Sequence, residues 1–392
     1  MTHHADDTTL ESVMETLIEN GMDGLGEAFS LLYNTAMEVE RSRFLGANRY
    51  ERSENRIGQS NGFKNKTIKS RVGKIALKIP QVRGLPVDSE GFYPKSLEKG
   101  IRSERALKAA LAEMYITGVS TRRVTKITEE LCGLEISSSE VSRATKLLDD
   151  EVESWRNRKL GIIKYLVLDA RYEKVRHGGS VIDCAVLVAI GVDEKGKRIV
   201  LGTSVALSEA EIHWRKFISS LLNRGMRGIE MVVSDDHKGL KKALQSTITS
   251  VPWQRCQCHL QRNAQAYVPK VSMRKKVAND LRRIFTAADR TEADQKLKDF
   301  VERYEKTAPR LAQWAEENIP EGLTVFKLPA EHQKRMRTSN SIERLNKEIK
   351  RRTRVATLFP NEESLLRLVS AILAEISDEW ETGKVYLSME TK

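Results

Sequence analysis

Cysteine is scarce in this sequence, with four residues among 392. Four cysteines in a chain of this length do not make the disulfide framework of a small secreted protein, so reduced thiols are expected. Apolar runs are also missing at the length of about 20 residues that a membrane-spanning helix needs. The first residues, MTHHADDTTLESVMETL, are acidic and polar, which argues against a signal peptide at this end. These absences predict a cytoplasmic protein with no membrane partner.

The composition is that of a soluble globular chain with a basic balance. Hydrophobic residues make up 40% of the sequence and charged residues 31%, and the length is enough for about two to three domains. The formal net charge is +12. A positive charge alone is weak evidence of a polyanionic partner, but here the basic residues gather at 41–78, 101–126, 262–290 and 334–354. This clustering favours a nucleic-acid partner.

The first hundred residues change from a helical to an extended pattern. Residues 8–45 keep the apolar spacing of helices, and we expect them to serve packing or dimerisation. Residues 46–66 are polar and rich in Gly and Asn, which predicts a linker or loop. The stretch IKSRVGKIALKIPQV then alternates and indicates a short β-ribbon closed by Pro80. Its outward Lys and Arg residues fit either a solvated edge or a ribbon that follows a phosphate backbone.

Residues 101–157 return to a helical pattern with short turns. Ser120 is the expected N-cap of one helix, and Ser137 with Glu140 has the spacing of a capping box for the next. Two helices joined by the short turn at Gly133 are typical of a helix-turn-helix, and also of a plain helical hairpin. In a basic chain the DNA-binding interpretation is favoured. The candidate DNA contacts are Arg122, Arg123, Ser142, Arg143 and Lys146.

From residue 161 the pattern predicts an α/β layer. IIKYLVLDA is an apolar strand ending on Asp169, two further strands follow, and IEMVVSDD is an apolar strand ending on Asp235 and Asp236. The predicted order of three strands, a helix, a strand and a helix indicates a mixed sheet. Residues 259–318 are almost wholly helical, and a last amphipathic helix covers 361–380.

Acids at matching strand ends suggest a metal site. In open α/β sheets, ligands bind at the carboxyl edge, where Asp169 and Asp235 are expected. Two carboxylates that approach each other repel unless a cation neutralises them, and Mg²⁺ or Mn²⁺ prefers such hard oxygen ligands. Each Asp by itself is also well explained as the end of a strand or the cap of a helix.

A third acid, Glu343, lies in the strongly basic stretch RTSNSIERLNKEIKRRTR, residues 337–354. Three interpretations compete: Glu343 caps the helix together with Asn340, it pairs with Lys347, or it is a catalytic acid. Three apolar residues of this stretch are expected to bury one helix face, and four basic residues are candidate DNA contacts. The apolar residues are Ile342, Leu345 and Ile349; the basic ones are Arg344, Lys347, Lys350 and Arg351.

Together the motifs LVLDARYEKVR, VVSDDHKGL, RCQCHLQRN and RTSNSIERLNKEIKRRTR resemble those of the Mutator-type DDE transposases of bacterial insertion sequences. The similarity covers most of the chain. It implies a ribonuclease-H-like core with a helical insertion before the last acid, and it assigns the acidic triad to Asp169, Asp235 and Glu343. Family members often have a small residue after the second acid, whereas this chain has Asp236, so the choice between Asp235 and Asp236 depends on the motif register alone.

The resemblance also places a Cys-x-x-His signature on Cys256 and His259. A closed zinc site is not expected, because no second pair of ligands lies nearby in the sequence. We interpret His259 as a residue that touches DNA or orients an acid and Cys256 as a packing residue; a structural helix start explains the pair as well. Most tryptophans are expected in the core, and Trp314 is a candidate for stacking on an unpaired base.

The sequence thus predicts a ribonuclease-H-like α/β core with a helical insertion, preceded by a mostly helical DNA-binding region. The expected function is a DNA transposase that binds inverted-repeat ends and cuts and joins strands with two Mg²⁺ ions, replaceable by Mn²⁺. Double-stranded DNA and at least a homodimer are the expected partners. The alternatives are a structure-specific nuclease on the same core and a non-catalytic DNA-binding regulator. The expected segments are 1–45 (dimerisation), 46–98 (linker and ribbon), 99–158 (helix-turn-helix), 159–259 (core), 260–335 (insertion) and 336–392 (core and last helix).

Overall fold

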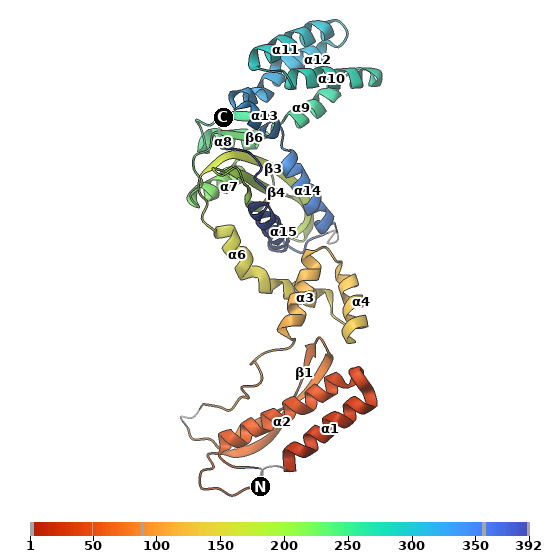
Figure 1. Ribbon diagram of the computed structural model, residues 1–392, viewed down its shortest axis with the longest axis vertical. Coiled ribbons are helices and arrows are strands. Elements are labelled where there is room, and N and C mark those ends of the chain that lie inside the picture. Colours follow the sequence, from red (N-terminus) through yellow and green to blue (C-terminus); the bar gives the residue numbers. More distant parts are fainter. Residues whose placement is uncertain (1–3, 49, 88–89, 355–357, 390–392) are drawn as a thin grey trace. The chain divides into compact units, whose positions relative to one another are not determined.

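A computed structural model describes residues 4–48, 50–87, 90–354 and 358–389 (Figure 1). The chain divides into two compact units, residues 1–147 and 148–392. None of the helices in these described ranges is both long and apolar enough to span a bilayer.

The first unit contains two helical parts and a two-stranded ribbon. Its elements are α1 (His4–Asn20), η1 (Gly21–Gly24), α2 (Leu25–Leu45), β1 (Gln59–Ser70), β2 (Gly73–Arg83), α3 (Arg105–Ile116), α4 (Thr121–Cys132) and α5 (Ser138–Ala144), followed by η2 (Thr145–Leu148). β1 and β2 pair antiparallel, and α2 packs on β2. Alternate residues of β2, Ile75, Leu77 and Ile79, are buried against Met37 of α2.

The ribbon is longer than the sequence pattern predicts. Residues 59–66, expected to be linker, belong to β1, and β2 continues past Pro80 to Arg83. β1 buries few side chains, so backbone pairing with β2 defines it and its hydrophobic pattern is weak. The predicted helix starts at α4 and α5 are confirmed, because Ser120 caps α4 and Ser137 with Glu140 forms a capping box at α5.

The second unit is built around a five-stranded mixed sheet. Its strands are β3 (Ile163–His177), β4 (Ser180–Asp193), β5 (Arg198–Ala206), β6 (Met231–Ser234) and β7 (Trp253–Arg255), in the order β5-β4-β3-β6-β7. β4 is antiparallel to β3 and β5, whereas β3, β6 and β7 are parallel. The prediction of an α/β fold with a mixed sheet is therefore confirmed.

Helices lie against both sides of this sheet. α6 (Asp149–Asn157) precedes it, and α7 (Glu211–Asn223) and α8 (Lys238–Thr247) share a core with Leu166 and Leu168 of β3. The intervening residues of β3 point to the opposite side, where α14 (Asn340–Thr353) and α15 (Glu362–Thr382) pack along the sheet (Figure 1). Asp169 is one of these intervening residues, so its side chain is on this second side of the sheet.

Helices alone fill the chain between β7 and α14. They are α9 (Gln257–Ala264), η3 (Gln265–Tyr267), η4 (Val271–Met273), α10 (Arg274–Phe285), α11 (Arg290–Glu305), α12 (Pro309–Asn318), η5 (Ile319–Gly322), η6 (Thr324–Lys327) and α13 (Ala330–Met336). They enclose an apolar cluster of their own, which includes Leu281, Phe300 and Leu311.

One detail of the predicted core, the end of β3, is wrong. β3 does not end at Asp169 but runs to His177, because it pairs with β4 along its whole length. The pairing of β3 with β6 does stop at Val167, so Asp169 lies just beyond the parallel part of the sheet. Trp253 lies on β7, packed against the core of the sheet, and its indole Nε1–H donates to Ser234 Oγ at 2.8 Å.

Candidate active site

The strand register brings Asp169 and Asp235 to the same level of the sheet. Tyr165 pairs with Met231 and Val167 with Val233, so each partner is numbered 66 higher. Asp235 follows Asp169 by the same 66 residues and comes directly after β6. Two parallel strands therefore present one carboxylate each at corresponding positions of the carboxyl edge.

Asp169 is held from two directions. Its Oδ1 accepts the backbone N–H of Ala170 at 3.0 Å, and its Oδ2 accepts the side-chain amide of Asn346 at 2.9 Å. Burial raises the pKa of Asp169 to about 7; the positive charge of His259 opposes this rise and the negative charge of Asp235 adds to it. Sequence reasoning gave Asn346 no role, although its position one turn after Glu343 was an available signal.

Glu343 lies in the first turn of α14 with its carboxylate turned toward His259. Glu343 Oε1 is 3.8 Å from His259 Nε2, and this oxygen is buried without a hydrogen-bond partner. The two simpler interpretations of Glu343 are wrong. No side-chain hydrogen bond caps the N-terminus of α14, and within the described ranges Glu343 forms no ion pair with Lys347.

Cys256 and His259 connect the strand edge to α14. Cys256 is fully buried at the start of α9; its backbone N–H donates to Ser234, and its Sγ accepts the N–H and the hydroxyl of Ser339 at 3.3 and 3.2 Å. Hydrogen bonding to the Cys256 sulfur, with the charges of Asp235 and Asp169, outweighs burial and raises the pKa of His259 to about 9. This shift favours the charged form of His259.

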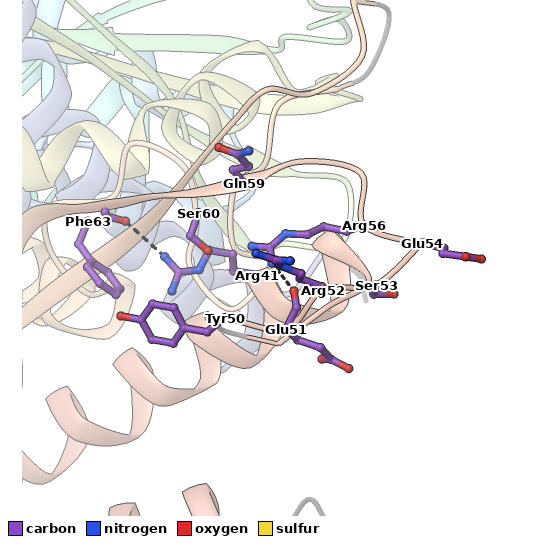
Figure 2. A pocket seen from close by; sticks show the side chains of 11 residues that line it. Arg41, Tyr50, Glu51, Arg52, Ser53, Glu54, Arg56, Gln59, Ser60 and Phe63 are labelled. Atoms are coloured by element: carbon purple, nitrogen blue, oxygen red, sulfur yellow. Dashed lines mark hydrogen bonds between the residues drawn. The ribbon is translucent and has the colours of Figure 1, made fainter.

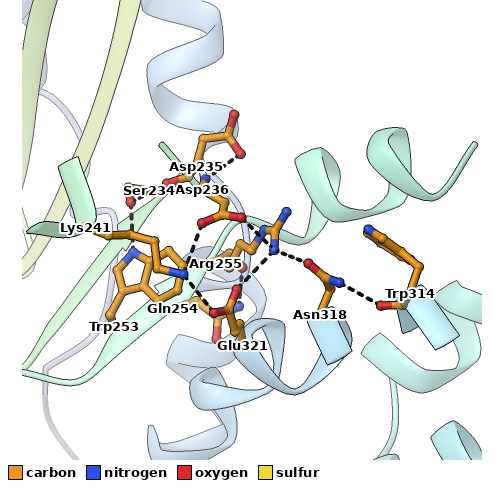
Figure 3. A network of polar contacts seen from close by, with 10 residues as sticks. All are labelled: Ser234, Asp235, Asp236, Lys241, Trp253, Gln254, Arg255, Trp314, Asn318 and Glu321. Atoms are coloured by element: carbon orange, nitrogen blue, oxygen red, sulfur yellow. Dashed lines mark hydrogen bonds and ion pairs between the residues drawn. The ribbon is translucent and has the colours of Figure 1, made fainter. Parts of the chain in front are cut away.

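Asp235 and Asp236 differ in their partners. The Asp236 carboxylate pairs with Lys241 and Arg255 at 3.1 and 3.0 Å (Figure 3). The Asp235 carboxylate instead accepts the backbone N–H of Asp236 at 2.7 Å, and it has no ion pair with a lysine or arginine among the described residues. Of the two acids, Asp235 is the one left available to a cation.

The predicted DNA contacts lie on exposed helix positions of the two units. Arg344, Lys347 and Lys350 are exposed on α14, and so is Arg351, which is paired with Glu348. In the first unit the exposed residues are Arg122 and Arg123 on α4, Arg143 on α5 and Lys146 on η2. Ser142 belongs to α5, but its side chain lies outside the described part of the structure.

Trp314 is placed where it packs within the protein. Its side chain is 7% exposed in the apolar cluster of the helical segment, and its ring stacks on Tyr267 with centroids 5.4 Å apart. Stacking on a base would require the ring to leave Tyr267, so the placement favours the packing role.

The first unit also contains an open pocket of about 880 Å³ that the sequence analysis did not predict (Figure 2). It is lined by residues between the end of α2 and the start of β1, among them Tyr50, Arg52 and Arg56. Arg41 borders it with its guanidinium over the Phe63 ring, 4.8 Å from the centroid. Glu51 and Glu54 also line the pocket, so only its arginines suit a phosphodiester and its aromatic rings a base.

The donor atoms around Asp169, Asp235 and Glu343 suit a hard cation. They are carboxylate oxygens. One of them, Glu343 Oε1, and the neighbouring amide oxygen Asn346 Oδ1 are buried without a hydrogen-bond partner. In the described parts of the chain no three His, Cys, Asp or Glu side chains already stand close enough to coordinate an ion. An all-oxygen set with orphaned acceptors fits Mg²⁺, provided that the carboxylates draw together on binding.

The site has acids at the carboxyl edge of a mixed sheet and an exposed basic helix next to them, as expected of an enzyme that acts on a phosphodiester backbone. Comparison with known proteins places the chain among the transposases. More narrowly, it belongs to the Mutator family: the family model described as "Transposase, Mutator family" matches residues 1–383.

Similar proteins of known type cover nearly the whole chain. The transposase for insertion sequence element IS406 of Burkholderia multivorans is 55% identical over 381 residues, 97% of each chain. The transposase for ISRM5 of Rhizobium meliloti is 41% identical, covering 100% of this chain and 96% of the relative. The transposase for IS256 in transposon Tn4001 of Staphylococcus aureus is 35% identical over 95% of this chain and 94% of the relative.

Proposed function

We propose that this protein is a DDE transposase that binds the ends of an insertion sequence and catalyses Mg²⁺-dependent DNA cleavage and strand transfer, with Asp169, Asp235 and Glu343 as the catalytic acids. One observation carries the proposal: Asp169 and Asp235 follow the last paired residues of the adjacent parallel strands β3 and β6 at the same offset, and Glu343 on α14 lies 3.8 Å from His259, whose pKa both aspartates raise. Membership of the Mutator transposase family supports the same conclusion.

The sheet supports the assignment of a ribonuclease-H-like core. If the strands β3 to β7 are numbered 1 to 5 in chain order, their order across the sheet is 3-2-1-4-5. Only the second of them, β4, is antiparallel to its neighbours. The helical segment 257–336 enters after β7 and returns to α14, so it lies between the second and third acids in the chain. In this assignment it is the insertion domain.

The residues around the acids have distinct roles in the reaction. Asp169, Asp235 and Glu343 provide oxygen ligands, while Asn346 fixes one oxygen of Asp169 and the charged His259 offsets the acids' repulsion. Two Mg²⁺ ions, when bound, activate the attacking oxygen and stabilise the leaving one. Arg344, Lys347 and Lys350 on the exposed face of α14 hold the DNA backbone. Water first cuts the end, and the released 3′-hydroxyl then attacks a second phosphodiester.

Recognition of the element's ends belongs to the first unit in this proposal. α3, α4 and α5 enclose one small core that includes Leu111, Val124 and Val141, which supports a helix-turn-helix with α4 and α5 as its two helices. The exposed basic residues of α4 and α5 would then contact DNA. The pocket beside Tyr50 and Arg52 is a further candidate for contact with the same duplex.

Strand transfer requires two ends to be held together, and α1 offers a surface for a dimer. Leu10, Met14 and Ile18 of α1 and Met22 of η1 follow one another every four residues and are 56%, 55%, 81% and 79% exposed. An apolar stripe of this kind along a helix is unusual on a surface that stays in water. We assign it to contact with the same helix of a second copy.

The test is to incubate the protein with DNA that carries the element's ends and Mg²⁺, and to map strand breaks to the nucleotide. Wild-type protein is expected to cut at the ends and join them to a second duplex. Asp169→Asn, Asp235→Asn and Glu343→Gln should each abolish both products while still binding the ends. Glu331→Gln, an exposed acid on α13, is the matched control and should cut normally.

Other outcomes separate the alternatives. Cutting of branched DNA or RNA–DNA hybrids regardless of end sequence would indicate a structure-specific nuclease. End binding without cleavage in Mg²⁺ or Mn²⁺ would indicate a DNA-binding regulator. Full cleavage by the three acid variants would overturn the triad.

A further inference from the structure

A network of four charged side chains lies beside the candidate active site (Figure 3). At its centre is Arg255 of β7, whose side chain is 4% exposed. One guanidinium nitrogen lies 3.0 Å from Asp236 and 3.0 Å from Glu321, and it donates to Asn318 Oδ1 at 2.9 Å. Asp236 follows β6, whereas Asn318 and Glu321 belong to the end of α12 and to η5.

Lys241 closes the network from the opposite side. Its Nζ lies 3.1 Å from Asp236 and 2.8 Å from Glu321, and 4.5 Å above the ring of Trp253. Burial disfavours the charged Lys241, but hydrogen bonds to Glu321 and Asp236 outweigh it and raise its pKa. Two cations and two carboxylates thus alternate, so every charge in the network is compensated.

The network joins the return of the helical segment to the strand edge. Next to Glu321, the carbonyl of Gly322 accepts the side-chain amides of Gln254 and Gln257 at 2.8 and 2.7 Å. The backbone N–H of Val325 donates to Gln254 Oε1 at 2.6 Å. Polar contacts from β7, α8 and α9 therefore converge on residues 318–325.

Asp235 is fixed by the same loop. Its Oδ1 accepts the backbone N–H of Asp236, so the orientation of the Asp236 backbone determines where the Asp235 carboxylate points. Asp236 in turn is held by Arg255 and Lys241, which also hold Glu321. A displacement of residues 318–321 would remove Glu321, the second carboxylate that holds Lys241 and Arg255 in the positions from which they bind Asp236.

We propose that Asp236 is a positioning residue: through Arg255 and Lys241 it clamps the Asp235 loop to Glu321, so that the docked helical segment holds Asp235 in its working orientation. Asp236 does not take part in the chemistry itself. The activity part of the test rests on the proposed function, whereas the docking part does not.

The experiment uses the full chain with Asp236→Asn, Glu321→Gln and the double variant. Asp294→Asn is the matched control, because Asp294 forms an exposed pair with Arg290 on α11 at 2.9 Å. The first readout is hydrogen exchange of residues 318–327 without DNA or metal. We expect faster exchange in both single variants, no further rise in the double variant, and no change in the control.

The second readout is end cleavage at saturating DNA. Removal of a residue that supports a metal ligand typically costs about 10- to 100-fold. We expect a loss of this size in each single variant, the same loss in the double variant, unchanged end binding, and a far deeper loss in Asp235→Asn. If Asp236→Asn does not fold, Lys241→Met breaks the same network at a side chain that is 30% exposed.

Three results would overturn the clamp. One is a Glu321→Gln variant in which residues 318–327 exchange hydrogen at the wild-type rate. Another is an Asp236→Asn variant that cleaves DNA ends as slowly as Asp235→Asn while its hydrogen exchange stays at the wild-type rate. That result would make Asp236 a metal ligand. The third is losses that multiply in the double variant, since they would show independent roles. If wild-type protein cuts no ends, the proposed function fails, and hydrogen exchange still decides the clamp.

Discussion

Replacement of Cys256 by alanine should weaken both the fold of the second unit and the placement of Glu343. Cys256 is fully buried, and its sulfur is the acceptor for two donors of Ser339, the residue that precedes α14. Ser339 is 1% exposed, so its backbone N–H cannot turn to water when the sulfur is removed. A single cysteine thus ties the end of β7 to the start of the helix that carries Glu343.

The magnitude follows from two losses. A buried donor left without an acceptor costs about 1–3 kcal/mol. Removal of a buried group the size of the sulfur adds roughly 1 kcal/mol. We therefore expect Cys256→Ala to lower the free energy of unfolding by about 2–4 kcal/mol. Since misplacement of a catalytic group by about 1 Å can cost about 100-fold, end cleavage should fall by one to two orders of magnitude.

Cys184→Ala provides the control for this prediction. Cys184 is equally buried, on β4, and it is not hydrogen-bonded to α14. Urea unfolding followed by tryptophan fluorescence reports the second unit, because all five tryptophans lie after residue 148. Cleavage is measured below the unfolding transition of every variant. Equal stability losses in the two variants, with equal cleavage, would refute the reasoning.

Two further predictions concern the first unit. Burial opposes ionisation of Glu140, but hydrogen bonds from Lys69 and Ser137 outweigh it and lower its pKa from 4.5 to about 2. A lowered pKa contributes stability above about pH 4.5 that is lost as the pH falls toward 2. The difference in free energy of unfolding between wild type and Glu140→Gln, measured by circular dichroism, should therefore be about 1–2 kcal/mol at pH 7, after allowance for solvent screening, and should vanish near pH 2. A difference that does not change with pH would contradict this prediction. Ile18→Glu should abolish the proposed dimer in sedimentation experiments, whereas Glu19→Gln on the same helix should not. An unchanged mass for Ile18→Glu would exclude the α1 stripe as the contact.

The sequence was informative where local pattern decides the structure. The apolar run before Asp235 and the capping box at Ser137 are signals carried by a few adjacent residues, and both were predicted correctly. β1 was missed because it buries little and depends on its partner strand. The end of β3 was misplaced for a related reason: pairing with β4 extends the strand through polar residues such as Arg171 and Glu173.

Contacts between distant segments could not be predicted. The choice between Asp235 and Asp236 depends on Arg255, and no spacing in the sequence reveals that Arg255 contacts Asp236. Asn346 likewise became a site residue only when α14 was seen beside β3. In both cases an ordinary polar residue acquires its role from a neighbour more than 15 positions away.

The pattern of charge compensation is the strongest structural argument for a cation at this site. Acids that surround it are matched by lysine or arginine: Asp236 and Glu321 by Lys241 and Arg255, Glu173 by Arg171, and Glu348 by Arg351 and Arg352. Within the described ranges, the three candidate catalytic acids have no such partner, and only His259 lies within ion-pair distance of one of them. Three partly buried carboxylates that share a single histidine as counter-charge are costly, whereas the surrounding acids have lysine or arginine partners. The proposed divalent cation would supply positive charge here, and the orphaned Glu343 Oε1 would then serve as one of its ligands.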